Sequence, residues 1–478
     1  MQNMPLPINK FFWVCCAVYL LYLAGISQTI MYYDAIGYHY LAQVLQHQGW
    51  TAYWSSGPNR EPLYPWFVSL ILRLAEGLRM DYVPVLLVAQ VFVFLSMLWL
   101  LEKLLQRMGV ETGYRLTVLF YAVFSPAFIY TVFTEWSEIV TYPLILIIIG
   151  VCIKAWMFIC GASQNKLKAL GWGAVLGMAV LSLTAVKAVM EPVAMFLIFP
   201  WAYAVFQHWH KARQKSFLAL LIILGFSAVY WTGINVYKWE NWYHNGQFVL
   251  TDRGSWALYG NVARRMAPLT QRQWEAAVLS VPTNGPECQR FLKPPNECQY
   301  WTFTPSDEWG HKAVGELSRQ GLSSPQINTA LIRMSFQKMF ANPLQAIALM
   351  FMEGMKFMFW EYNAWPEFAV YPSWLRHLYE NGAFYAFLHY GMALLTFVSL
   401  VHALVFLVQN RKNIFLPHED GFKLTIGIFF TSLFIVLYIF FYSFFYCSGR
   451  YAMPLAPLYL ILIAFFFKKV YAQIIRPA

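Results

Sequence analysis

The chain has 478 residues, of which 59% are hydrophobic and only 12% are charged, about half the charged share of an average soluble domain. Its net charge is +11, which in a soluble protein would suggest nucleic-acid binding. In a helical membrane protein such an excess comes from basic cytoplasmic loops. The composition therefore excludes a soluble domain, and we expect membrane lipids and no nucleic acid as partners.

Several apolar stretches are long enough to cross a bilayer core of about 30 Å as helices. The ten predicted spans are 11–31, 82–104, 115–133, 137–158, 169–186, 190–207, 217–236, 384–409, 424–446 and 452–467. The first stretch is too long for the core of a cleavable signal peptide, so we expect it to be retained. The sequence thus predicts an all-α polytopic membrane protein of about ten transmembrane helices.

Lysine and arginine are unevenly divided between the short loops. If the N-terminus is cytoplasmic, the short outer loops hold only Lys187 and Arg450. Basic loops of helical membrane proteins face the cytoplasm, so we expect both termini to be cytoplasmic. The chain has no Asn-x-Ser/Thr sequon, which gives no support for a glycosylated eukaryotic protein. We therefore expect a cell membrane of the bacterial inner-membrane kind.

Two further apolar stretches, 63–72 and 345–362, are alternative candidates for spans. The first is short, and the second carries Glu353 and Lys356. If the first stretch crossed the membrane, the basic loops that follow it would face outward. We therefore expect both stretches to form juxtamembrane helices on the outer face, in the interface.

The spans divide the chain into three parts. We predict an N-terminal transmembrane module over 1–236 with a first outer loop over 32–81, an extracytoplasmic region over 237–382, and a C-terminal transmembrane module over 383–478. The middle of the extracytoplasmic region is polar and contains several Gly and Pro residues. This composition favours short helices and loops over strands.

Two cysteines differ from the other five. Cys288 and Cys298 lie ten residues apart in the polar extracytoplasmic region, whereas the others lie in or beside apolar stretches. An oxidising compartment favours a disulfide between such a pair. Two free thiols are the alternative.

The first outer loop holds two candidate sites. Asp34 stands at the outer end of the first span, where a charge is costly and indicates function. Tyr38 follows four residues later, so on a helix the two share a face; the alternative is an Asp that caps a surface helix. Arg60 and Glu61 precede Pro62. The Arg60 guanidinium suits a phosphate, and the alternative is a local surface pair with Glu61.

The short outer loops hold further charges. Glu135 and Glu138 begin the returning span, where acids also favour a helix N-terminus. Lys187 and Glu191 are four apart, the spacing of an ordinary helical ion pair, and Arg450 has the alternative of a snorkelling interfacial cation. All these charges fall on one predicted face, where cations would suit a lipid phosphate and a carboxylate would activate a hydroxyl.

Four motifs carry a family resemblance. DAIGYHYLA, REPLYPWFVSLIL, SPAFIYTVFTEWSE and GRYAMPLAPLYLILIA resemble, in this order, motifs of GT-C-type membrane glycosyltransferases that use polyprenyl-phosphate sugars. These include protein O-mannosyltransferases and the aminoarabinose transferase of lipid A. The resemblance covers most of residues 1–210 and 384–467, and it leaves 240–380 unmatched.

The resemblance implies a helical bundle with an outer-face cavity. It implies transfer of a sugar from a polyprenyl-phosphate donor to a hydroxyl of a lipid, glycan or protein acceptor, by an inverting single displacement. The residues that we assign on this basis are Asp34, Glu61 and Glu135 as catalytic groups, Arg60, Arg450 and Lys187 as donor-phosphate ligands, and Tyr38, Tyr64, Glu191 and Tyr451 as substrate-binding residues.

Departures from the family pattern limit the cofactors. Many relatives have two adjacent acidic residues in the first motif, but Asp34 lies between Tyr33 and Ala35. We therefore assign no metal site and no other cofactor, and a divalent metal is the alternative. The sequence has no P-loop for a nucleotide. Two alternative functions stay open: a ligase or polymerase that uses a diphosphate-linked lipid, and a transporter or flippase, which would need ionisable residues inside several spans.

Overall fold

The computed structural model describes residues 6–27, 29, 31, 34–58, 60–161, 165–209, 212–282, 286–292, 296–361, 376–378, 381–414 and 421–475. Every regular element in this part of the chain is a helix. The helices of the main bundle are α1 (Leu6–Ile26), α5 (Tyr82–Arg107), α6 (Thr112–Phe124), α7 (Pro126–Val132), α8 (Glu138–Cys160), α9 (Lys166–Thr184), α10 (Met190–Leu197), α11 (Phe199–His208), α12 (Arg213–Asn245), α21 (Gly382–Gln409), α22 (Phe422–Tyr442), α23 (Gly449–Ala452) and α24 (Ala456–Ile475).

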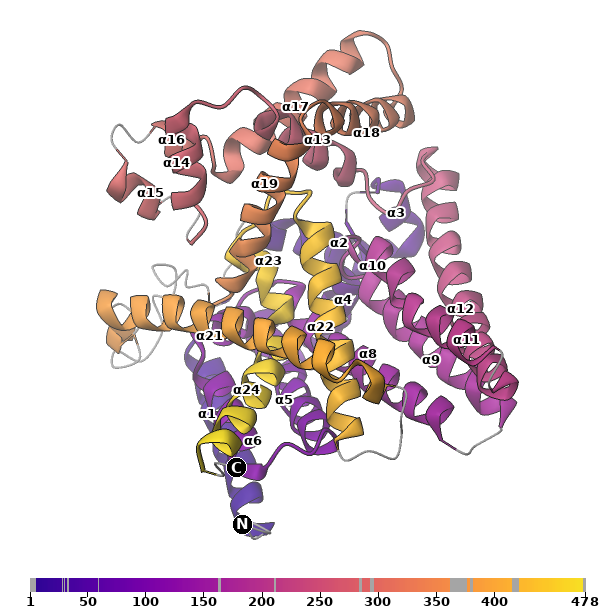
Figure 1. The fold of residues 1–478 in the computed structure, drawn as a ribbon. Coiled ribbons are helices and arrows are strands. Elements are labelled where there is room, and N and C mark those ends of the chain that lie inside the picture. The colour runs from indigo at the N-terminus through magenta and orange to yellow at the C-terminus, as the bar shows by residue number, and fades with distance from the viewer. Residues whose placement is uncertain are drawn as a thin grey trace.

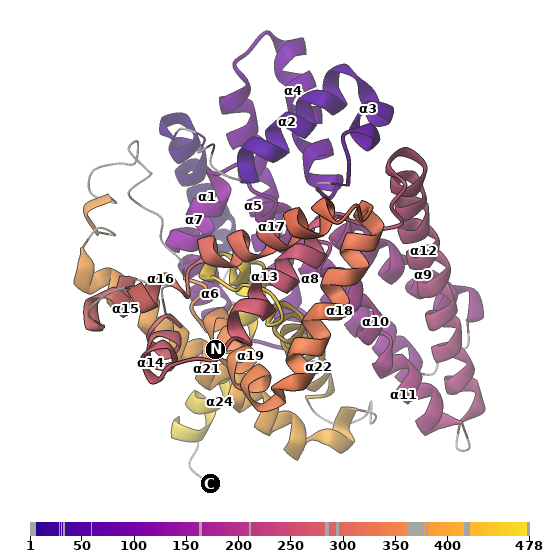
Figure 2. The same ribbon diagram turned by 90° about the horizontal axis from the view of Figure 1, so that it is seen from above.

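Two further groups of helices lie at one end of the bundle, the upper end in Figure 1. The first group is α2 (Asp34–His47), α3 (Gly49–Ser55) and α4 (Leu63–Leu78). The second, which we call the cap, is α13 (Arg253–Arg265), α14 (Gln271–Leu279), α15 (Pro286–Phe291), α16 (Asn296–Gln299), α17 (Phe303–Arg319), α18 (Ser324–Ala341), α19 (Pro343–Met355) and the 3₁₀ turn η1 (Lys356–Met358). Seen from above, α13 and α17 lie over the middle of the bundle, and α2 to α4 lie along one side (Figure 2).

The helices of the bundle have the length, and its surface has the apolar side chains, that are typical of a membrane protein. Eight helical segments among the described residues are long and apolar enough to cross a membrane, and the bent pair α6–α7 would be a ninth. The apolar stretch of α1, Lys10–Ile26, is shorter, which accounts for the difference from the ten predicted spans. Large side chains such as Phe92 and Leu394 are exposed around the bundle, as suits contact with acyl chains. The prediction of an all-α polytopic membrane protein is confirmed.

The predicted span 115–133 is not one straight helix. It is divided at Ser125 into α6 and α7, which are bent by 57°. Pro126 has no N–H and disfavours helical geometry in the residue before it, and Ser125 has φ −67° and ψ 127°. The Ser125 side chain then accepts a hydrogen bond from the backbone N–H of Phe128. Proline thus ends one helix and begins the next.

Two other elements bear on how the bundle and the cap are arranged. The stretch 345–362, which we predict as a juxtamembrane helix, contains most of α19, and α19 runs from the rest of the cap toward the bundle (Figure 1). α21 occupies the predicted span 384–409 and has a suitable length and apolarity. It runs sideways across α22 and α24 in Figure 1, and it packs against both helices.

Glycines bring α9 and α12 into close contact. A Cβ atom on Gly173 would lie 2.1 Å from the Ile222 carbonyl oxygen, and one on Gly225 would lie 2.3 Å from the Leu170 carbonyl oxygen. Small residues at such crossings let two backbones pack directly, which is how many membrane helices associate. The two helices therefore form a closely packed pair, and α12 also packs against α3.

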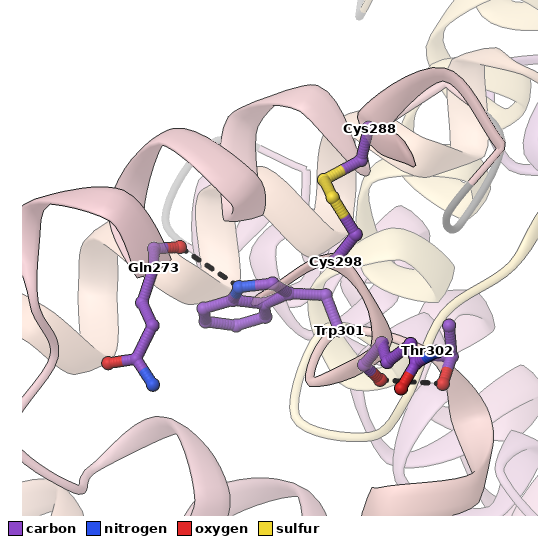
Figure 3. Close-up of a disulfide and its surroundings, with 6 residues drawn as sticks. Gln273, Cys288, Cys298, Trp301 and Thr302 are labelled. Atoms are coloured by element: carbon purple, nitrogen blue, oxygen red, sulfur yellow. Dashed lines mark hydrogen bonds between the residues drawn. A yellow bond between two sulfur atoms is a disulfide. The ribbon is translucent and has the colours of Figure 1, made fainter. Parts of the chain in front are cut away.

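The cap has a small core of its own. Cys288 and Cys298 form a disulfide beside the buried ring of Trp301 (Figure 3). The Trp301 indole N–H donates a 2.9 Å hydrogen bond to the Gln273 carbonyl of α14, as Figure 3 shows. The disulfide and this bond tie α14, α15 and α16 together.

Candidate active site

The site is built around Asp34, at the capped end of the bundle. Asp34 is the first residue of α2, where the helix dipole favours a carboxylate. Arg60 donates a hydrogen bond to its Oδ1 atom. Arg450 Nη2 lies 3.0 Å from Oδ2, and Arg253 Nη1 lies 3.8 Å from Oδ1. Three guanidinium groups from distant parts of the sequence thus meet one carboxylate.

Arg60 is held from both sides. Its guanidinium carbon lies 4.9 Å from the centroid of the Tyr38 ring, a cation–π contact. The guanidinium also lies against α2 at Gly37, where a Cβ atom would be 3.5 Å from Arg60 Nε, an ordinary contact distance. The hydroxyls of Tyr53 and Tyr237 donate to the Arg60 carbonyl at 2.8 and 3.3 Å. These contacts fix both the backbone and the charged end of Arg60.

Arg450 points inward, which contradicts the alternative of a snorkelling surface cation. Its guanidinium carbon lies 3.6 Å from the centroid of the Trp136 ring. Its Nε atom lies 3.4 Å from Glu138 Oε1, while Nη2 faces Asp34. Arg450 therefore bridges the carboxylates of Asp34 and Glu138 while it packs on the Trp136 ring.

Lys187 lies on the Glu138 side of this bridge. Its Nζ atom donates a 2.8 Å hydrogen bond to Glu138 Oε1, with side chains that are 9% and 0% exposed. Burial would lower the pKa of Lys187, but Glu138 raises it well above its ordinary value. The spacing to Glu191 does not produce an ion pair, because Glu191 pairs with Lys238 at 2.5 Å. Lys187 therefore contacts a carboxylate within the site, and its role as a phosphate ligand stays a prediction.

Replacing Lys187 by Met tests how strongly this pair supports the site. Methionine keeps much of the side-chain volume but leaves the Glu138 carboxylate buried beside Arg450 alone. We expect the free energy of unfolding to fall by about 3 kcal/mol, measured by chemical denaturation in mild detergent. Adding Glu138→Gln should restore much of the loss. Equal destabilisation in the single and double variants would contradict a structural role for the pair.

Glu61 binds a neighbouring loop. Its carboxylate accepts a 2.7 Å hydrogen bond from the Ala188 backbone N–H, and the nearby Leu63 N–H donates to the Ala185 carbonyl at 3.0 Å. These bonds join the segment that carries Arg60 to the loop that carries Lys187. The contact of Glu61 in the structure is thus with the backbone, and its catalytic role stays a prediction.

Glu135 lies apart from the arginines. It accepts a hydrogen bond from the Tyr82 hydroxyl, and its Oε2 atom lies 3.3 Å from His39 Nδ1. Glu138, three residues later, takes the place in the cluster that we assigned to Glu135. Both side chains are buried, but Glu138 begins α8 and contacts Lys187 and Arg450, whereas Glu135 precedes the helix and contacts Tyr82 and His39.

The predicted tyrosines line or support the cluster. The Tyr38 hydroxyl lies 3.1 Å from Ser137 Oγ, and the ring of Tyr64 packs edge-on against that of Tyr38. The Tyr64 hydroxyl donates to Gln90 Oε1 at 3.2 Å, away from Asp34. Tyr451 follows Arg450, and its ring stacks on Tyr442.

Arg253 was not foreseen from the sequence. It begins α13 in the cap, and its side chain is 45% exposed. The Asp252 N–H donates a 3.0 Å hydrogen bond to the Pro58 carbonyl, which ties the start of α13 to the turn before Arg60. Nothing local in the sequence around Arg253 points to the site, because the contact depends on how the cap sits on the bundle.

The charges of the cluster favour an anionic ligand. Burial alone would raise the pKa of the Asp34 carboxyl, but Arg450 and Arg60 lower it well below its ordinary value, so Asp34 is ionised. Even with Glu61 counted, cations outnumber carboxylates. The cations are Arg60, Lys187, Arg253 and Arg450, and the carboxylates are Asp34, Glu61 and Glu138. Within the described residues, no three His, Cys, Asp or Glu side chains come together as a metal site.

The chain has a remote similarity to a solved structure. No protein-family model matches the chain, and no curated protein matches it. Among solved structures, the chain is similar to the crystal structure of ArnT from Cupriavidus metallidurans bound to undecaprenyl phosphate. The identity is 11% and the TM-score is 0.37, over 92% of this chain and 78% of that chain. A similarity of this size assigns neither a family nor a substrate.

Proposed function

We propose that the protein is a membrane glycosyltransferase that transfers a sugar from a polyprenyl-phosphate donor to an acceptor hydroxyl at the outer face of the membrane. The observation that carries this proposal is the convergence of guanidinium groups on the Asp34 carboxylate at one end of an apolar bundle. Guanidinium groups match the geometry and charge of a phosphate. A site of this kind beside acyl chains suits a phosphate that is carried by a lipid.

The four motifs support the same conclusion. Each motif that resembles the GT-C glycosyltransferases contributes a charged residue to the cluster: Asp34, Arg60, Glu138 and Arg450. The short predicted outer loops hold only Lys187 and Arg450 as basic residues, and both lie in the cluster. The distribution of basic loops therefore supports an outer-face position for the site.

Asp34 and the donor phosphate would compete for the same guanidinium groups. In the structure Arg60 and Arg450 bind the carboxylate, which holds its pKa far too low for a useful base. When a phosphate binds these arginines, Asp34 loses part of its stabilisation, and its pKa moves back toward the ordinary range. Donor binding would thus turn Asp34 from an ion-pair partner into a proton acceptor.

The proposed reaction is a single displacement at the anomeric carbon. The acceptor oxygen forms a bond to this carbon while the bond from the carbon to the phosphate oxygen breaks. Asp34 takes the hydroxyl proton, and the polyprenyl phosphate leaves with the electron pair. Arg60 and Arg450 stabilise the charge that grows on the phosphate. Attack from the side opposite the leaving group inverts the anomeric centre.

A comparison of donor classes tests the function. Purified protein in lipid nanodiscs would receive radiolabelled sugar as a polyprenyl-phosphate, polyprenyl-diphosphate or nucleotide conjugate, with a membrane lipid extract as the acceptor source. We expect transfer from the polyprenyl-phosphate conjugate alone. Transfer from the diphosphate conjugate would instead indicate a ligase or polymerase. Lipid or sugar movement across proteoliposomes without any transfer would indicate a flippase or transporter.

A further inference from the structure

The segment 443–448, which leads from α22 to α23 and Arg450, is held by side chains of the cap. Arg265, the last residue of α13, donates to the Ser443 carbonyl at 3.0 Å and to the Phe445 carbonyl at 2.9 Å. Asn261, one turn earlier on α13, donates to the Phe444 carbonyl at 3.1 Å. Three consecutive carbonyls of this segment are thus bound by one helix.

Glu353 of α19 holds the other end of the same segment. Its Oε2 atom accepts a 2.8 Å hydrogen bond from the Cys447 backbone N–H. Its Oε1 atom lies 3.2 Å from Arg265 Nη2 and 2.9 Å from Lys356 Nζ. The three charged side chains are between 2% and 4% exposed. We call Arg265 and Glu353, with their bonds to this backbone, the clamp.

A buried charge network of this kind is costly to form. The loss of hydration is offset only when the ion pairs are close and further hydrogen bonds are made. Apolar side chains in place of a buried ion pair often give equal or greater stability. The hydrogen bonds of the clamp go to the backbone of a segment without regular structure. The clamp therefore fixes the backbone of this segment at Ser443, Phe445 and Cys447.

Arg450 lies directly beyond the clamped segment. It is three residues after Cys447, in the short helix α23. Its guanidinium must reach Asp34 at 3.0 Å and Glu138 at 3.4 Å at the same time. A small displacement of the preceding backbone would break one of these contacts, because a bridging guanidinium has little freedom.

Helix α13 itself is fixed at close range. A Cβ atom on Gly260 would lie 2.0 Å from the Ser306 carbonyl oxygen, and one on Gly310 would lie 2.6 Å from the Trp256 carbonyl oxygen. The first residue of α13, Arg253, faces Asp34, and the last, Arg265, binds the segment before Arg450. One helix of the cap therefore reaches the site with its first residue and the segment that leads to Arg450 with its last.

We infer that Arg265 and Glu353 are positioning residues, which hold Arg450 in the place where it can bind a phosphate beside Asp34. This makes the cap a working part of the site. The ligand named in this inference rests on the proposed function, whereas the clamp geometry does not.

The first test measures the clamp itself. Cys447 is a free thiol and is fully buried, so in the wild-type protein it should react slowly with N-ethylmaleimide. In Arg265→Gln, which loses the bonds to Ser443 and Phe445, we expect roughly tenfold faster alkylation of Cys447, because local opening rises as stabilising contacts are lost. Mass mapping of the labelled peptide gives the rate in native membranes.

Arg264→Gln is the matched control. Arg264 is a buried arginine beside Arg265 on the same helix, but its guanidinium donates to the Tyr300 and Thr302 carbonyls and to Asn261 Oδ1 within the cap. It faces the segment at longer range, with its guanidinium carbon 6.0 Å from the centroid of the Tyr446 ring. Its loss should disturb the cap and accelerate Cys447 alkylation clearly less than the loss of Arg265. Equal acceleration in both variants would show general loosening of the cap and would overturn the clamp.

The second test asks whether the clamp acts through Arg450. The probe is polyprenyl phosphate, titrated onto the protein in nanodiscs and followed by tryptophan fluorescence. We expect Arg265→Gln to weaken binding about tenfold, and Arg265→Lys, which keeps the charge but loses the fork, to weaken it less. In an Arg450→Ala background, Arg265→Gln should cause no further loss, since residues that act as a unit are not additive.

The outcomes separate the two proposals. A full additional loss in the Arg450→Ala background, or wild-type affinity in Arg265→Gln, would overturn the positioning role. If the wild-type protein binds no polyprenyl phosphate, the proposed function fails, and the Cys447 rates still decide whether the clamp holds the segment. If Arg265→Gln does not fold, Arg265→Lys and Glu353→Gln provide the same comparison with milder changes.

Discussion

Replacing Asp34 by Asn is expected to lower the turnover of sugar transfer by roughly 10²- to 10⁴-fold, the usual contribution of a general base. The amide keeps the shape of the side chain and an oxygen that can accept from Arg60, but it cannot take the acceptor proton. Affinity for the donor should stay the same or increase, because the negative charge that competes with the phosphate is gone. Steady-state transfer assays over a range of donor concentrations separate the two effects.

Asp81→Asn is the matched control for this variant. Asp81 caps α5 at the capped end of the bundle, where its carboxylate accepts from the Val83 N–H. Its replacement should cost about 1 kcal/mol of stability at most and leave transfer near the wild-type rate. If Asp34→Asn behaves like Asp81→Asn, then Asp34 only caps its helix, and the assignment of the base is wrong.

Replacing Arg450 by Ala is expected to reduce the turnover of sugar transfer by roughly 10²- to 10³-fold. This is the usual effect of removing one hydrogen-bond donor that stabilises charge in the transition state. Unlike the change at Asp34, this one should also weaken polyprenyl-phosphate binding. Arg450 bridges Asp34 and Glu138 through different atoms of its fork. Arg450→Lys should therefore restore only part of the loss, because a single ammonium cannot span both partners.

Arg115→Ala provides the control for a lost buried arginine. Arg115 is 11% exposed and pairs with Glu102 at 3.1 Å near the loop between α5 and α6, away from Asp34. This variant should lose stability without a specific loss of donor affinity. If Arg115→Ala and Arg450→Ala reduce donor affinity equally at matched protein stability, Arg450 is not a phosphate ligand.

The helical bundle could be predicted from composition because the bilayer allows few solutions. A span must satisfy its own backbone groups, so a long apolar stretch becomes a helix. Hydropathy averages over each stretch, however, and it does not locate breaks. The bend arises because Pro126 lacks a backbone N–H and because Ser125 caps the helix that follows. The sideways course of α21 depends on packing against α22 and α24, which no single stretch encodes.

The site shows the same division between local and distant information. Asp34, Arg60 and Arg450 stand in recognisable motifs, and the structure brings them within contact distance. Within the third motif we chose Glu135, although helical spacing would have placed Glu138 on the buried face of α8 with Tyr142. The catalytic role of Glu135 stays a prediction, and the contact of Glu138 with Arg450 is visible only in the structure.

Other parts of the site have no local signature. Arg253 reaches Asp34 from the cap, in a region where no motif was recognised. The clamp joins Arg265 to Ser443, 178 residues further along the chain, and Glu353 to Cys447, 94 residues further along. Such contacts arise from the docking of the cap onto the bundle, and they become visible only in three dimensions.

The central claim is that Arg60 and Arg450 bind the phosphate of a polyprenyl lipid in competition with Asp34. A cryo-electron microscopy map of the protein in nanodiscs, with polyprenyl phosphate added, tests it most directly. We expect phosphate density within about 3 Å of both guanidinium groups, with the Asp34 carboxylate displaced from at least one of them. A phosphate bound at another face of the bundle, with the Asp34–Arg60–Arg450 cluster unchanged, would contradict it.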